Sequence, residues 1–438
     1  MGAAARLGLY GLLVASPFIA AALGPEHEEA GETIFFGAGK AAALLGFSIL
    51  AMQFVLSARI KWAERPFGLD RVMRFHKWMG VTAGFLILAH PLGLVLGGAG
   101  WGLIFSFGRH WAVGLGKIAF VLLAVLVIAS VYRVTLRIEY QKWLLAHNAA
   151  AAIILVLGFV HSWALGDELQ SGAMRTWWVI LLAGAGLAFV DSRLIVPLRR
   201  RRRAHTVAEV RRETPNVWTI KMTPPKGAAK PDYKPGQFHF LTLYRGEGVP
   251  VEEHPFTISS SPSEEGYIAS TIKESGDYTS TIGRTKPGDR AAVDGPFGRF
   301  SYLEHPGEGD LVFIAGGIGI TPLRAMLRHM SDTGSERQVL LLYGNRTAED
   351  VAFREELESI AAGGKPRLRI VHVLSEPKAD WQGEKGYVDE EKIRRLCGDT
   401  SGKAFYICGP PVMMKKVIAA LKRMGVPRGR IHYEMFSL

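Results

Sequence analysis

The sequence predicts a membrane-embedded all-α bundle of six helices, followed by an antiparallel β-barrel and a doubly wound α/β domain. Three observations predict this order. Apolar runs of about 20 residues, the length that crosses a bilayer core, recur six times in the first half of the chain. Short segments of alternating polarity follow, and repeated strand-then-helix patterns complete the chain. We place the domains at residues 1–203, 204–304 and 305–438.

The apolar runs define the candidate membrane spans. They cover residues 6–23, 34–57, 75–97, 113–132, 144–164 and 176–197. The first run is short, and its small residues at Ala20–Ala22 also fit a cleaved signal peptide. Cleavage would leave five spans with the same orientation, so both readings stay open.

The charge distribution excludes a nucleic-acid-binding protein and orients the spans. The net charge of +12 is concentrated in residues 1–203, which hold 20 Lys and Arg against 10 Asp and Glu. With the N-terminus inside, 16 of these 20 cations fall on the inner side, as the positive-inside rule requires. We therefore expect an integral, multi-pass protein of the plasma membrane with its second half in the cytoplasm. The two cysteines, Cys397 and Cys408, give no disulfide framework.

Four histidines lie within the predicted spans, where ionisable residues are costly and indicate function. His76 and His90 lie in the third span, and His147 and His161 in the fifth. Each pair is 14 residues apart, so its members point within roughly 40° of one another and differ in depth by about 21 Å. Because both helices run outward, His76 shares the inner level with His147, and His90 shares the outer level with His161.

Two facing imidazoles at one depth are typical of an axial clamp for a haem iron. The spacing therefore predicts two haems, one above the other, held by His76 with His147 and by His90 with His161. Two ligands per level make a poor zinc site, because no carboxylate or thiol lies beside them. The alternative is that these histidines are hydrogen-bonded packing residues or line a pore.

The second half carries one recognisable nucleotide-binding pattern. The segments TVAEVRRE, VWTIKM, QFHFLTL and IASTIK predict barrel strands, and LVFIAGG, QVLLLYG, LRIVHVLS and AFYICGP predict strands of the parallel sheet. Gly316-Gly317-Ile318-Gly319-Ile320-Thr321-Pro322 follows the first of these parallel strands. Glycines at such a turn let backbone N–H groups approach a pyrophosphate, although a plain tight turn is the alternative.

The order of the motifs in the second half resembles that of the ferredoxin-reductase-type flavin module. In sequence they are PGQF (235–238), HPFTISSSP (254–262), KESGDYT (273–279), DGPFG (294–298), GGIGITP (316–322), YGNR (343–346), CGPP (408–411) and a terminal EMF. Joined to six spans with paired histidines, the whole chain resembles the ferric reductase and NADPH oxidase superfamily of transmembrane flavocytochromes b.

The resemblance implies sites for FAD and NAD(P)H. Residues implied for FAD are His254, Pro255, Phe256, Thr257, Lys273, Gly276, Thr279 and Phe436. Residues implied for NAD(P)H are Gly316, Gly317, Ile318, Gly319, Thr321, Pro322, Arg346, Cys408, Gly409 and Pro410. Thr257, Cys408 and Phe436 would lie where the hydride is transferred, with no nucleophilic role for Cys408. Many soluble relatives have Arg and Tyr where this chain has His254 and Phe256. A planar cation at Arg346 suits a 2′-phosphate, which favours NADPH over NADH.

The resemblance also implies an electron path from NAD(P)H through FAD and two b-type haems to an acceptor on the outer face. Oxygen and ferric chelates are the two leading acceptors. Animal oxidases have a further histidine at the position of Leu94, which weakens the case for oxygen. Two alternatives stay open: a membrane-anchored flavin reductase without haem, and an electron donor to a soluble protein on the outer face. Besides the bilayer, no obligate protein partner is evident, and no nucleic acid is expected.

Overall fold

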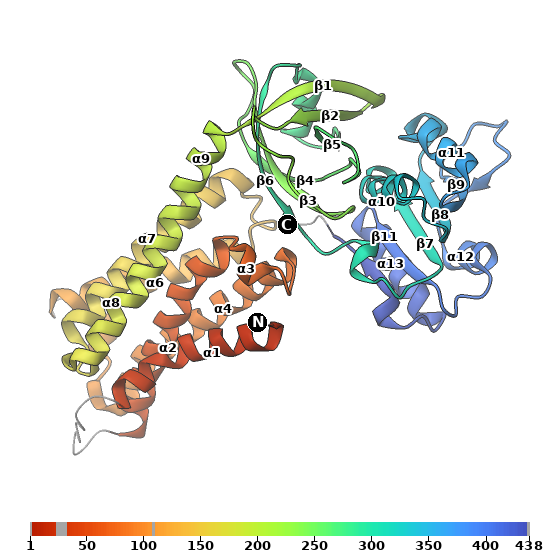
Figure 1. Cartoon of the computed structure of the whole chain (residues 1–438). Coiled ribbons are helices and arrows are strands. Elements are labelled where there is room, and N and C mark those ends of the chain that lie inside the picture. The colour runs from red at the N-terminus through yellow and green to blue at the C-terminus, as the bar shows by residue number, and fades with distance from the viewer. Residues whose placement is uncertain (1, 23–32, 107–109, 436–438) are drawn as a thin grey trace. The chain divides into compact units, whose positions relative to one another are not determined.

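The structure, a computed structural model shown in Figure 1, describes residues 2–22, 33–106 and 110–435. Contacts divide the chain into two compact units, Met1–Pro197 and Leu198–Leu438. Among the described residues, the first unit is entirely helical and the second contains all of the strands.

Six helices of the first unit are long and apolar enough to cross a membrane, counted over the described residues. They are α1 (Ala3–Ala22), α2 (Ile34–Ser57), α4 (Leu69–Leu94), α6 (Trp111–Val131), α7 (Tyr140–Leu165) and α8 (Gly172–Val190). A π-helical turn, η1 (Val95–Ala99), extends α4, and a second one, η3 (Asp191–Ile195), joins α8 to α9 (Val196–Arg202). Short elements connect these helices: α3 (Lys61–Glu64), α5 (Gly102–Phe105) and η2 (Glu168–Gln170). The predicted spans are confirmed, although five helices begin two to six residues earlier than the apolar runs.

Close backbone contact joins α2 to α4. A Cβ atom on Gly93 would lie 2.7 Å from the Cα of Gly39, and one on Gly97 would lie 2.6 Å from the Cβ of Phe36. Small residues of this kind let membrane helices approach closely, where lipid supplies no hydrophobic force to press them together. The two helices therefore pack backbone against backbone along this seam.

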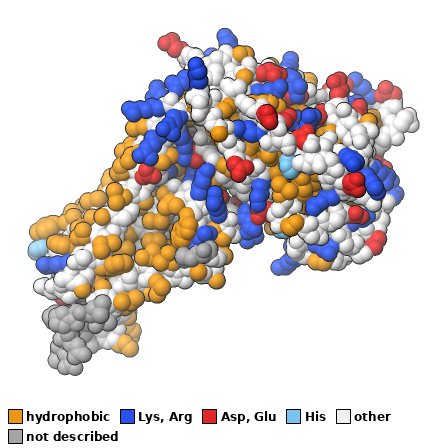
Figure 2. All heavy atoms as spheres, viewed as in Figure 1, with side chains coloured by type: hydrophobic (Ala, Val, Ile, Leu, Met, Phe, Trp, Pro, Cys, Tyr) orange, Lys and Arg blue, Asp and Glu red, His pale blue; other side chains and the backbone are white. Residues whose placement is uncertain are grey.

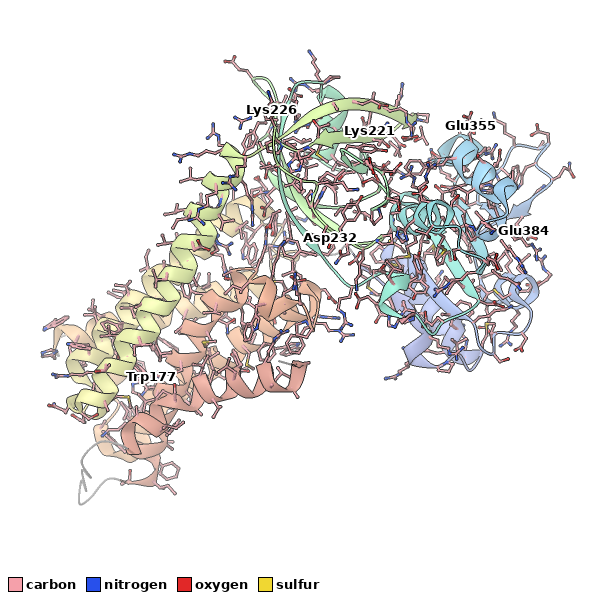
Figure 3. All side chains as sticks on the ribbon, in the orientation of Figure 1. Trp177, Lys221, Lys226, Asp232, Glu355 and Glu384 are labelled. Carbon is pink, nitrogen blue, oxygen red and sulfur yellow. The ribbon has the colours of Figure 1, made fainter. Side chains whose placement is uncertain are left out.

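Helix α8 packs against three other helices through two tryptophans. Trp177, labelled in Figure 3, donates its indole N–H to the Ser16 hydroxyl of α1 at 2.5 Å. The ring of Trp178 is buried and stacks on Phe47 of α2, with ring centroids 4.7 Å apart. Its N–H donates to Ser162 of α7 at 2.8 Å. Each indole N–H thus finds the acceptor that it needs in an apolar environment.

The surface of the helical unit is apolar. Figure 2 shows hydrophobic side chains over the visible face of these helices, whereas charged side chains gather over the strands. Phe85, Leu145 and Leu187 are between 68% and 75% exposed. A contiguous apolar surface of this kind is unfavourable in water and is normal on helices that face lipid.

The second unit begins with a six-stranded antiparallel sheet of order β4-β3-β6-β1-β2-β5. Its strands are β1 (His205–Thr214), β2 (Val217–Thr223), β3 (Phe238–Tyr244), β4 (Glu253–Thr257), β5 (Ile268–Lys273) and β6 (Arg290–Phe297). A bridge between Ile258 and Ser270 joins the ends of the two edge strands. The interior is filled by aliphatic side chains, among them Ile220, Leu241 and Ile272. The predicted antiparallel β-barrel is confirmed.

A six-stranded parallel sheet of order β10-β9-β8-β7-β11-β12 follows. Its strands are β7 (Leu311–Gly316), β8 (Gln338–Asn345), β9 (Arg367–Leu374), β10 (Glu384–Lys385), β11 (Ala404–Cys408) and β12 (Ile431–Tyr433). The helices are α10 (Ile320–Asp332), α11 (Arg354–Gly363), α12 (Glu390–Cys397) and α13 (Pro411–Arg423).

Both faces of this sheet are covered, so the predicted doubly wound domain is confirmed. One hydrophobic core packs the sheet against α10 and α11, and a second packs it against α12 and α13. Strands β7 and β11 are buried along their whole length. The strand order reverses between these two neighbours, which creates the crevice where open α/β sheets bind their ligands.

Candidate functional site

Helices α4 and α7 bring the four membrane histidines together as two pairs. The rings of His76 and His147 have centroids 6.3 Å apart and planes inclined by 57°. The rings of His90 and His161 also have centroids 6.3 Å apart, with planes inclined by 76°. The 14-residue spacing on both helices thus places one pair at each of two depths.

The ring separation fits a metal atom held between two imidazoles. Two metal–nitrogen bonds of about 2.0–2.1 Å, with about 1.2 Å from each nitrogen to its ring centre, place the centroids about 6.5 Å apart. The observed 6.3 Å agrees with this value at both levels. Direct hydrogen bonding between the rings would bring them closer, because an N–H···N contact needs its nitrogens about 3 Å apart.

Hydrogen bonds to Nδ1 fix the orientation of the outer pair. His161 Nδ1 lies 2.8 Å from the carbonyl oxygen of Ala112, and His90 Nδ1 lies 3.1 Å from that of Gly39. A carbonyl oxygen only accepts, so each Nδ1 carries the proton and each Nε2 keeps its lone pair. This second contact is the usual support for a metal-binding histidine.

The inner pair is supported differently. His147 Nδ1 lies 3.2 Å from the hydroxyl of Ser130, which donates its own proton to the Leu126 carbonyl at 2.6 Å. The hydroxyl therefore accepts from His147. His76 Nδ1 makes no hydrogen bond of good geometry within the described residues, although the side chain interacts with the backbone of Gln53. The two pairs thus offer different electronic surroundings to whatever they bind.

A glycine makes room for the His161 ring. A Cβ atom on Gly116 of α6 would lie 2.6 Å from both Nδ1 and Cε1 of His161. The neighbouring Gly114 has no atom within 4 Å of the corresponding position. Sequence reasoning missed Gly116, Ser130 and the Ala112 carbonyl, because a glycine within an apolar helix is a weak local signal.

Basic residues near the histidines differ in their surroundings. Arg74, two residues before His76, donates to Asp70 at 2.8 Å on the exposed surface of α4. Arg193, displayed by the π-helical turn η3, lies near enough to His76 and His147 to interact electrostatically with both. π-helical turns often mark functional positions.

In the barrel, β4 carries the predicted flavin motif. His254 stacks on Tyr278, with ring centroids 4.1 Å apart, and shares a 2.8 Å hydrogen bond with Glu252. Thr257 is buried at the end of the strand, and the ring of Phe256 packs on the barrel core. Pro255 pairs with Phe240 of β3.

The remaining barrel residues predicted for FAD lie on one loop and its flanks. Lys273 ends β5, and Gly276 adopts a φ of +140°, which favours glycine. Thr279 begins the 3₁₀ turn η4 (Thr279–Arg284), and its hydroxyl accepts from the Ser275 N–H at 2.8 Å. Phe436, predicted to stack on the flavin, lies outside the described residues.

In the parallel sheet, the turns after β7 and β11 touch each other. A Cβ atom on Gly319 would lie 2.2 Å from the Cys408 carbonyl oxygen, and one on Gly409 would lie 3.0 Å from the Gly316 Cα. A Cβ atom on Gly316 would in turn meet the ring of Pro410 at 2.8 Å. Only glycine allows these backbones to approach this closely. The glycine-rich turn and the Cys408 turn therefore form one continuous backbone surface at the crevice.

The other residues of this turn begin helix α10. Gly317 has a φ of +52°, and the carbonyl of Ile318 accepts from the Thr321 hydroxyl at 3.0 Å. Thr321 and Pro322 are buried in the first turn of α10. Burial, followed by the negative charge of Glu434, raises the pKa of the Cys408 thiol. The thiol is therefore protonated at neutral pH, which agrees with a packing role beside the nucleotide.

Arg346 follows β8 at the same end of the sheet. Its guanidinium is 68% exposed and lies 3.7 Å from Asp350 and 3.9 Å from Glu376. The cation is thus available at the surface, but two carboxylates already surround it. A bound 2′-phosphate would have to compete with both.

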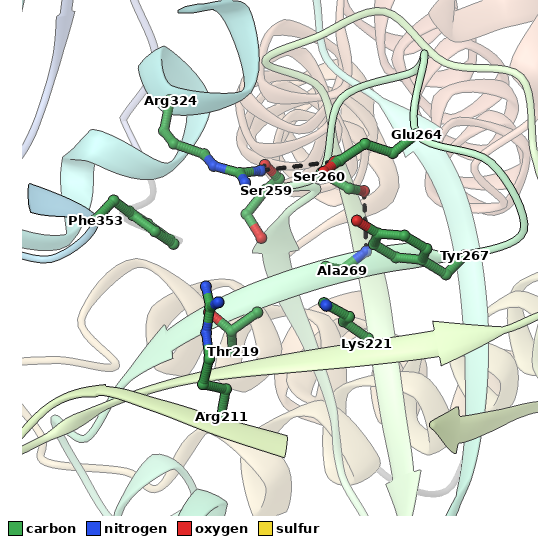
Figure 4. A pocket seen from close by; sticks show the side chains of 10 residues that line it. All are labelled: Arg211, Thr219, Lys221, Ser259, Ser260, Glu264, Tyr267, Ala269, Arg324 and Phe353. Atoms are coloured by element: carbon green, nitrogen blue, oxygen red, sulfur yellow. Dashed lines mark hydrogen bonds and ion pairs between the residues drawn. The ribbon is translucent and has the colours of Figure 1, made fainter. Parts of the chain in front are cut away.

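A separate polar cluster, drawn in Figure 4, ties α10 to the barrel. Arg324 makes a bidentate contact with Glu356 at 2.6 and 3.0 Å and donates to the Ser259 carbonyl at 2.6 Å. Glu264 lies 3.8 Å from the same guanidinium. A cavity of about 20 Å³, room for one water molecule, adjoins this cluster. None of the residues predicted to bind FAD or NAD(P)H lines this cavity. We therefore interpret the cluster as a structural contact between the barrel and the parallel sheet.

Three families match successive parts of the chain. Residues 42–158 match the ferric reductase like transmembrane component, residues 203–299 match an FAD-binding domain, and residues 313–418 match an oxidoreductase NAD-binding domain. These ranges contain, in turn, three of the four paired histidines, the HPFT segment, and both glycine turns at the crevice. His161 lies just beyond the first range.

Individual relatives resemble about half of this chain. The reductase component of propane 2-monooxygenase from Rhodococcus jostii is 31% identical over 53% of this chain, which spans 62% of that protein. The gamma subunit of sulfhydrogenase 2 from Pyrococcus furiosus is 30% identical over 46% of this chain and 70% of its own length. The chain thus spans less than two thirds of the first relative.

One solved structure aligns with most of the chain. The flavohemoglobin of Malassezia yamatoensis, solved with bound FAD and heme, aligns with 91% of this chain and 99% of its own, with a TM-score of 0.50. The sequence identity is 18%, so this likeness concerns the fold alone.

Proposed function

The chain belongs to the ferric reductase and NADPH oxidase family, as a multi-pass NAD(P)H-dependent oxidoreductase, and on that premise we propose the path of its electrons. They pass from NAD(P)H through FAD and two b-type haems to an acceptor on the outer face of the plasma membrane. The observation that carries this proposal is the pair of histidine pairs, each with ring centroids 6.3 Å apart.

The four histidines are the residues that would hold the haems. His76 with His147 would bind the inner haem iron, and His90 with His161 the outer one. Bis-histidine haem carries single electrons and leaves no open iron position for a substrate. The protein contributes the orientation of the rings, since three histidines are hydrogen-bonded through Nδ1, which leaves their Nε2 atoms free to bind iron.

The barrel and the parallel sheet would hold the flavin and the nucleotide. His254, Pro255, Phe256 and Thr257 of β4, with Lys273, Gly276 and Thr279, form the proposed FAD surface. FAD accepts two electrons as a hydride and releases them singly, which haem requires. The continuous turn surface at Gly316–Gly319 and Cys408–Pro410 lets a pyrophosphate approach the backbone N–H groups at the crevice.

The charge pattern supports a cytoplasmic position for the flavin unit. Four arginines end α9, directly before β1. With the other basic residues of the inner loops, they account for 16 of the 20 cations in residues 1–203. In this orientation His76 and His147 form the level closer to the cytoplasm, and electrons move outward.

Either oxygen or a ferric chelate is the proposed acceptor. The bis-histidine pairing at the outer level favours electron transfer at the haem edge over oxygen coordination, and it serves both acceptors equally. NADPH is the proposed donor over NADH, on the charge of Arg346 alone.

Anaerobic reduction tests the path. Purified protein in detergent is mixed with NADPH or NADH while the flavin and haem absorbances are followed separately. The proposal requires flavin reduction first and then reduction of two haems per chain. A folded, FAD-loaded protein without a b-type Soret band would show a flavin reductase instead. Assaying superoxide and ferrous iron together in sided vesicles then identifies the acceptor.

A further inference from the structure

Two histidines and a glutamate from opposite ends of the parallel-sheet domain meet at the edge of its sheet. His305 and Glu308 lie in the turn before β7, and His432 lies in the last strand, β12. One nitrogen of each histidine and one carboxylate oxygen lie within 4.8 Å of one another. The rings of His305 and His432 face each other, with centroids 4.0 Å apart and planes inclined by 28°.

The cluster is partly shielded from solvent, and hydrogen bonds hold its carboxylate in place. The side chains of His432 and Glu308 are 13% and 12% exposed. One oxygen of Glu308 lies 2.6 Å from His432 Nε2, and the other accepts from the Tyr406 hydroxyl at 2.7 Å. Tyr406 also lies beside His432 in the sheet, with ring centroids 4.6 Å apart. The carboxylate is thus fixed by a neighbour in the way that metal-binding carboxylates usually are.

A hydrogen-bonded network explains only part of this arrangement. It accounts for Glu308, His432 and Tyr406, each of which has a partner. Across the residues that the structure describes, His305 makes a ring contact with His432 but no hydrogen bond through its ring nitrogens. A second imidazole held against a histidine–carboxylate pair, with nitrogens left for another partner, is the arrangement that a metal ion would complete.

We propose that His305, Glu308 and His432 form a binding site for a divalent transition-metal ion of the zinc class. Two imidazoles and one carboxylate are a known three-ligand set for Zn²⁺, with a water molecule in the fourth position. Imidazole ligands select against Mg²⁺ and Ca²⁺, which prefer oxygen. Neither cysteine of the chain competes for the ion, because both are buried elsewhere.

The ion would join two segments that are 124 residues apart in the chain. One is the connection that leads from the barrel into the parallel sheet, and the other is the three-residue strand β12. β12 lies at the sheet edge, pairs only with β11 among the described strands, and leads into the C-terminal segment. Zinc binding would therefore restrain the start of the segment that carries Phe436.

Zinc uptake by the full-length protein tests the site without reference to haem reduction or turnover. The detergent-purified chain is dialysed against buffered free Zn²⁺, and zinc, iron and FAD per chain are measured by elemental analysis and absorbance. We expect the wild type to bind one zinc ion per chain. His305→Ala and Glu308→Gln should each lower the zinc affinity by more than about 100-fold, since even residues that only support a metal ligand contribute about 10–100-fold. Tyr406→Phe should weaken binding by about 10–100-fold, because it leaves the three ligands in place.

Matched controls separate this site from adventitious binding. His329 shares a 2.7 Å hydrogen bond with the Tyr302 hydroxyl but has no second imidazole beside it, so His329→Gln should bind zinc as the wild type does. X-ray absorption at the zinc edge should show two imidazoles and oxygen at about 2.0–2.1 Å, without sulfur at about 2.3 Å. Hydrogen exchange in β12 should slow on zinc addition in the wild type and in His329→Gln, but not in His305→Ala.

Three results would overturn the proposal. The first is zinc uptake by His305→Ala equal to that of the wild type, with FAD content showing that both are folded. The second is a sulfur ligand at the zinc edge. The third is a wild-type protein that takes up no more zinc than the Glu308→Gln variant.

Discussion

Replacing Gly116 with alanine should remove the outer haem and leave the inner one in place. The new Cβ atom would lie 2.6 Å from two atoms of the His161 ring. Non-bonded carbon atoms sit at about 3.5–4.0 Å, so the ring or the α6 backbone must move by about 1 Å. Metal–ligand distances tolerate about 0.2 Å, and a displacement of this size therefore breaks the axial bond.

Helix stability cannot account for such a loss. Alanine is favoured over glycine within a helix by about 1 kcal/mol, so the substitution should stabilise α6 itself. Gly114→Ala is the matched control, because it lies on the same helix and its Cβ atom would meet nothing within 4 Å. Both variants add the same methyl group, and only one of them adds it against a proposed ligand.

The assay is the ratio of b-type haem to FAD, measured by reduced-minus-oxidised spectra and by redox titration. Gly116→Ala should give about half of the wild-type haem signal, with the potential of the remaining haem close to that of the inner one. Gly114→Ala should match the wild type. Two haems at unchanged potentials in Gly116→Ala would refute the assigned role of His161, as would an equal loss in both variants.

Four further outcomes follow from the contacts described above. His90→Ala should abolish transmembrane electron transfer while NAD(P)H-driven dye reduction by the flavin persists; simultaneous loss of both activities in a folded protein would contradict the assigned order. Arg324→Met should destabilise the flavin unit by about 3 kcal/mol, because it removes three charge-assisted hydrogen bonds from a guanidinium that is only 11% exposed. Arg328→Met, at a 39% exposed side chain, should cost under about 1 kcal/mol in the same denaturant titration. Burial lowers the pKa of His239 to about 3, so the unfolded chain takes up this proton first as the pH falls below 6.5. The stability that this group contributes is fully present above about pH 6.5 and falls by about 1.4 kcal/mol per pH unit below it. The unfolding midpoint of His239→Gln should therefore fall less steeply with decreasing pH than that of the wild type. Equal dependence on pH in both proteins would mean that His239 is not the cause. Arg346→Ala should raise KM for NADPH by about 10-fold or more and leave KM for NADH unchanged, since a charge-assisted hydrogen bond is lost; parallel changes would mean that this residue does not select the nucleotide.

The fold was predictable because strong local patterns determine it. Runs of apolar residues are stable only in a bilayer or a core, and alternation with period two leaves little choice but strand. The pairing of His76 with His147 was also within reach, because helical geometry converts equal spacing on two parallel helices into equal depth. These inferences require only the sequence of a single segment, or the relative direction of two helices.

The supporting contacts were not predictable, since they depend on which segments become neighbours. The Gly39 carbonyl that accepts the hydrogen bond from His90 is 51 residues away in sequence, and nothing near either residue signals the contact. The same holds for Arg324 and Ser259, separated by 65 residues, and for Glu308 and His432. Arg346 shows the opposite case, in which a residue was identified from its chemistry but its carboxylate neighbours were not foreseen.

The glycine seam between α2 and α4 has a consequence for the order of assembly. His90 can donate to the Gly39 carbonyl only when these two helices are already in contact at that point. The ring is therefore oriented by helix association, a step that needs no cofactor. Under the proposed function, haem would therefore enter a bundle in which contact with α2 already orients the His90 ring.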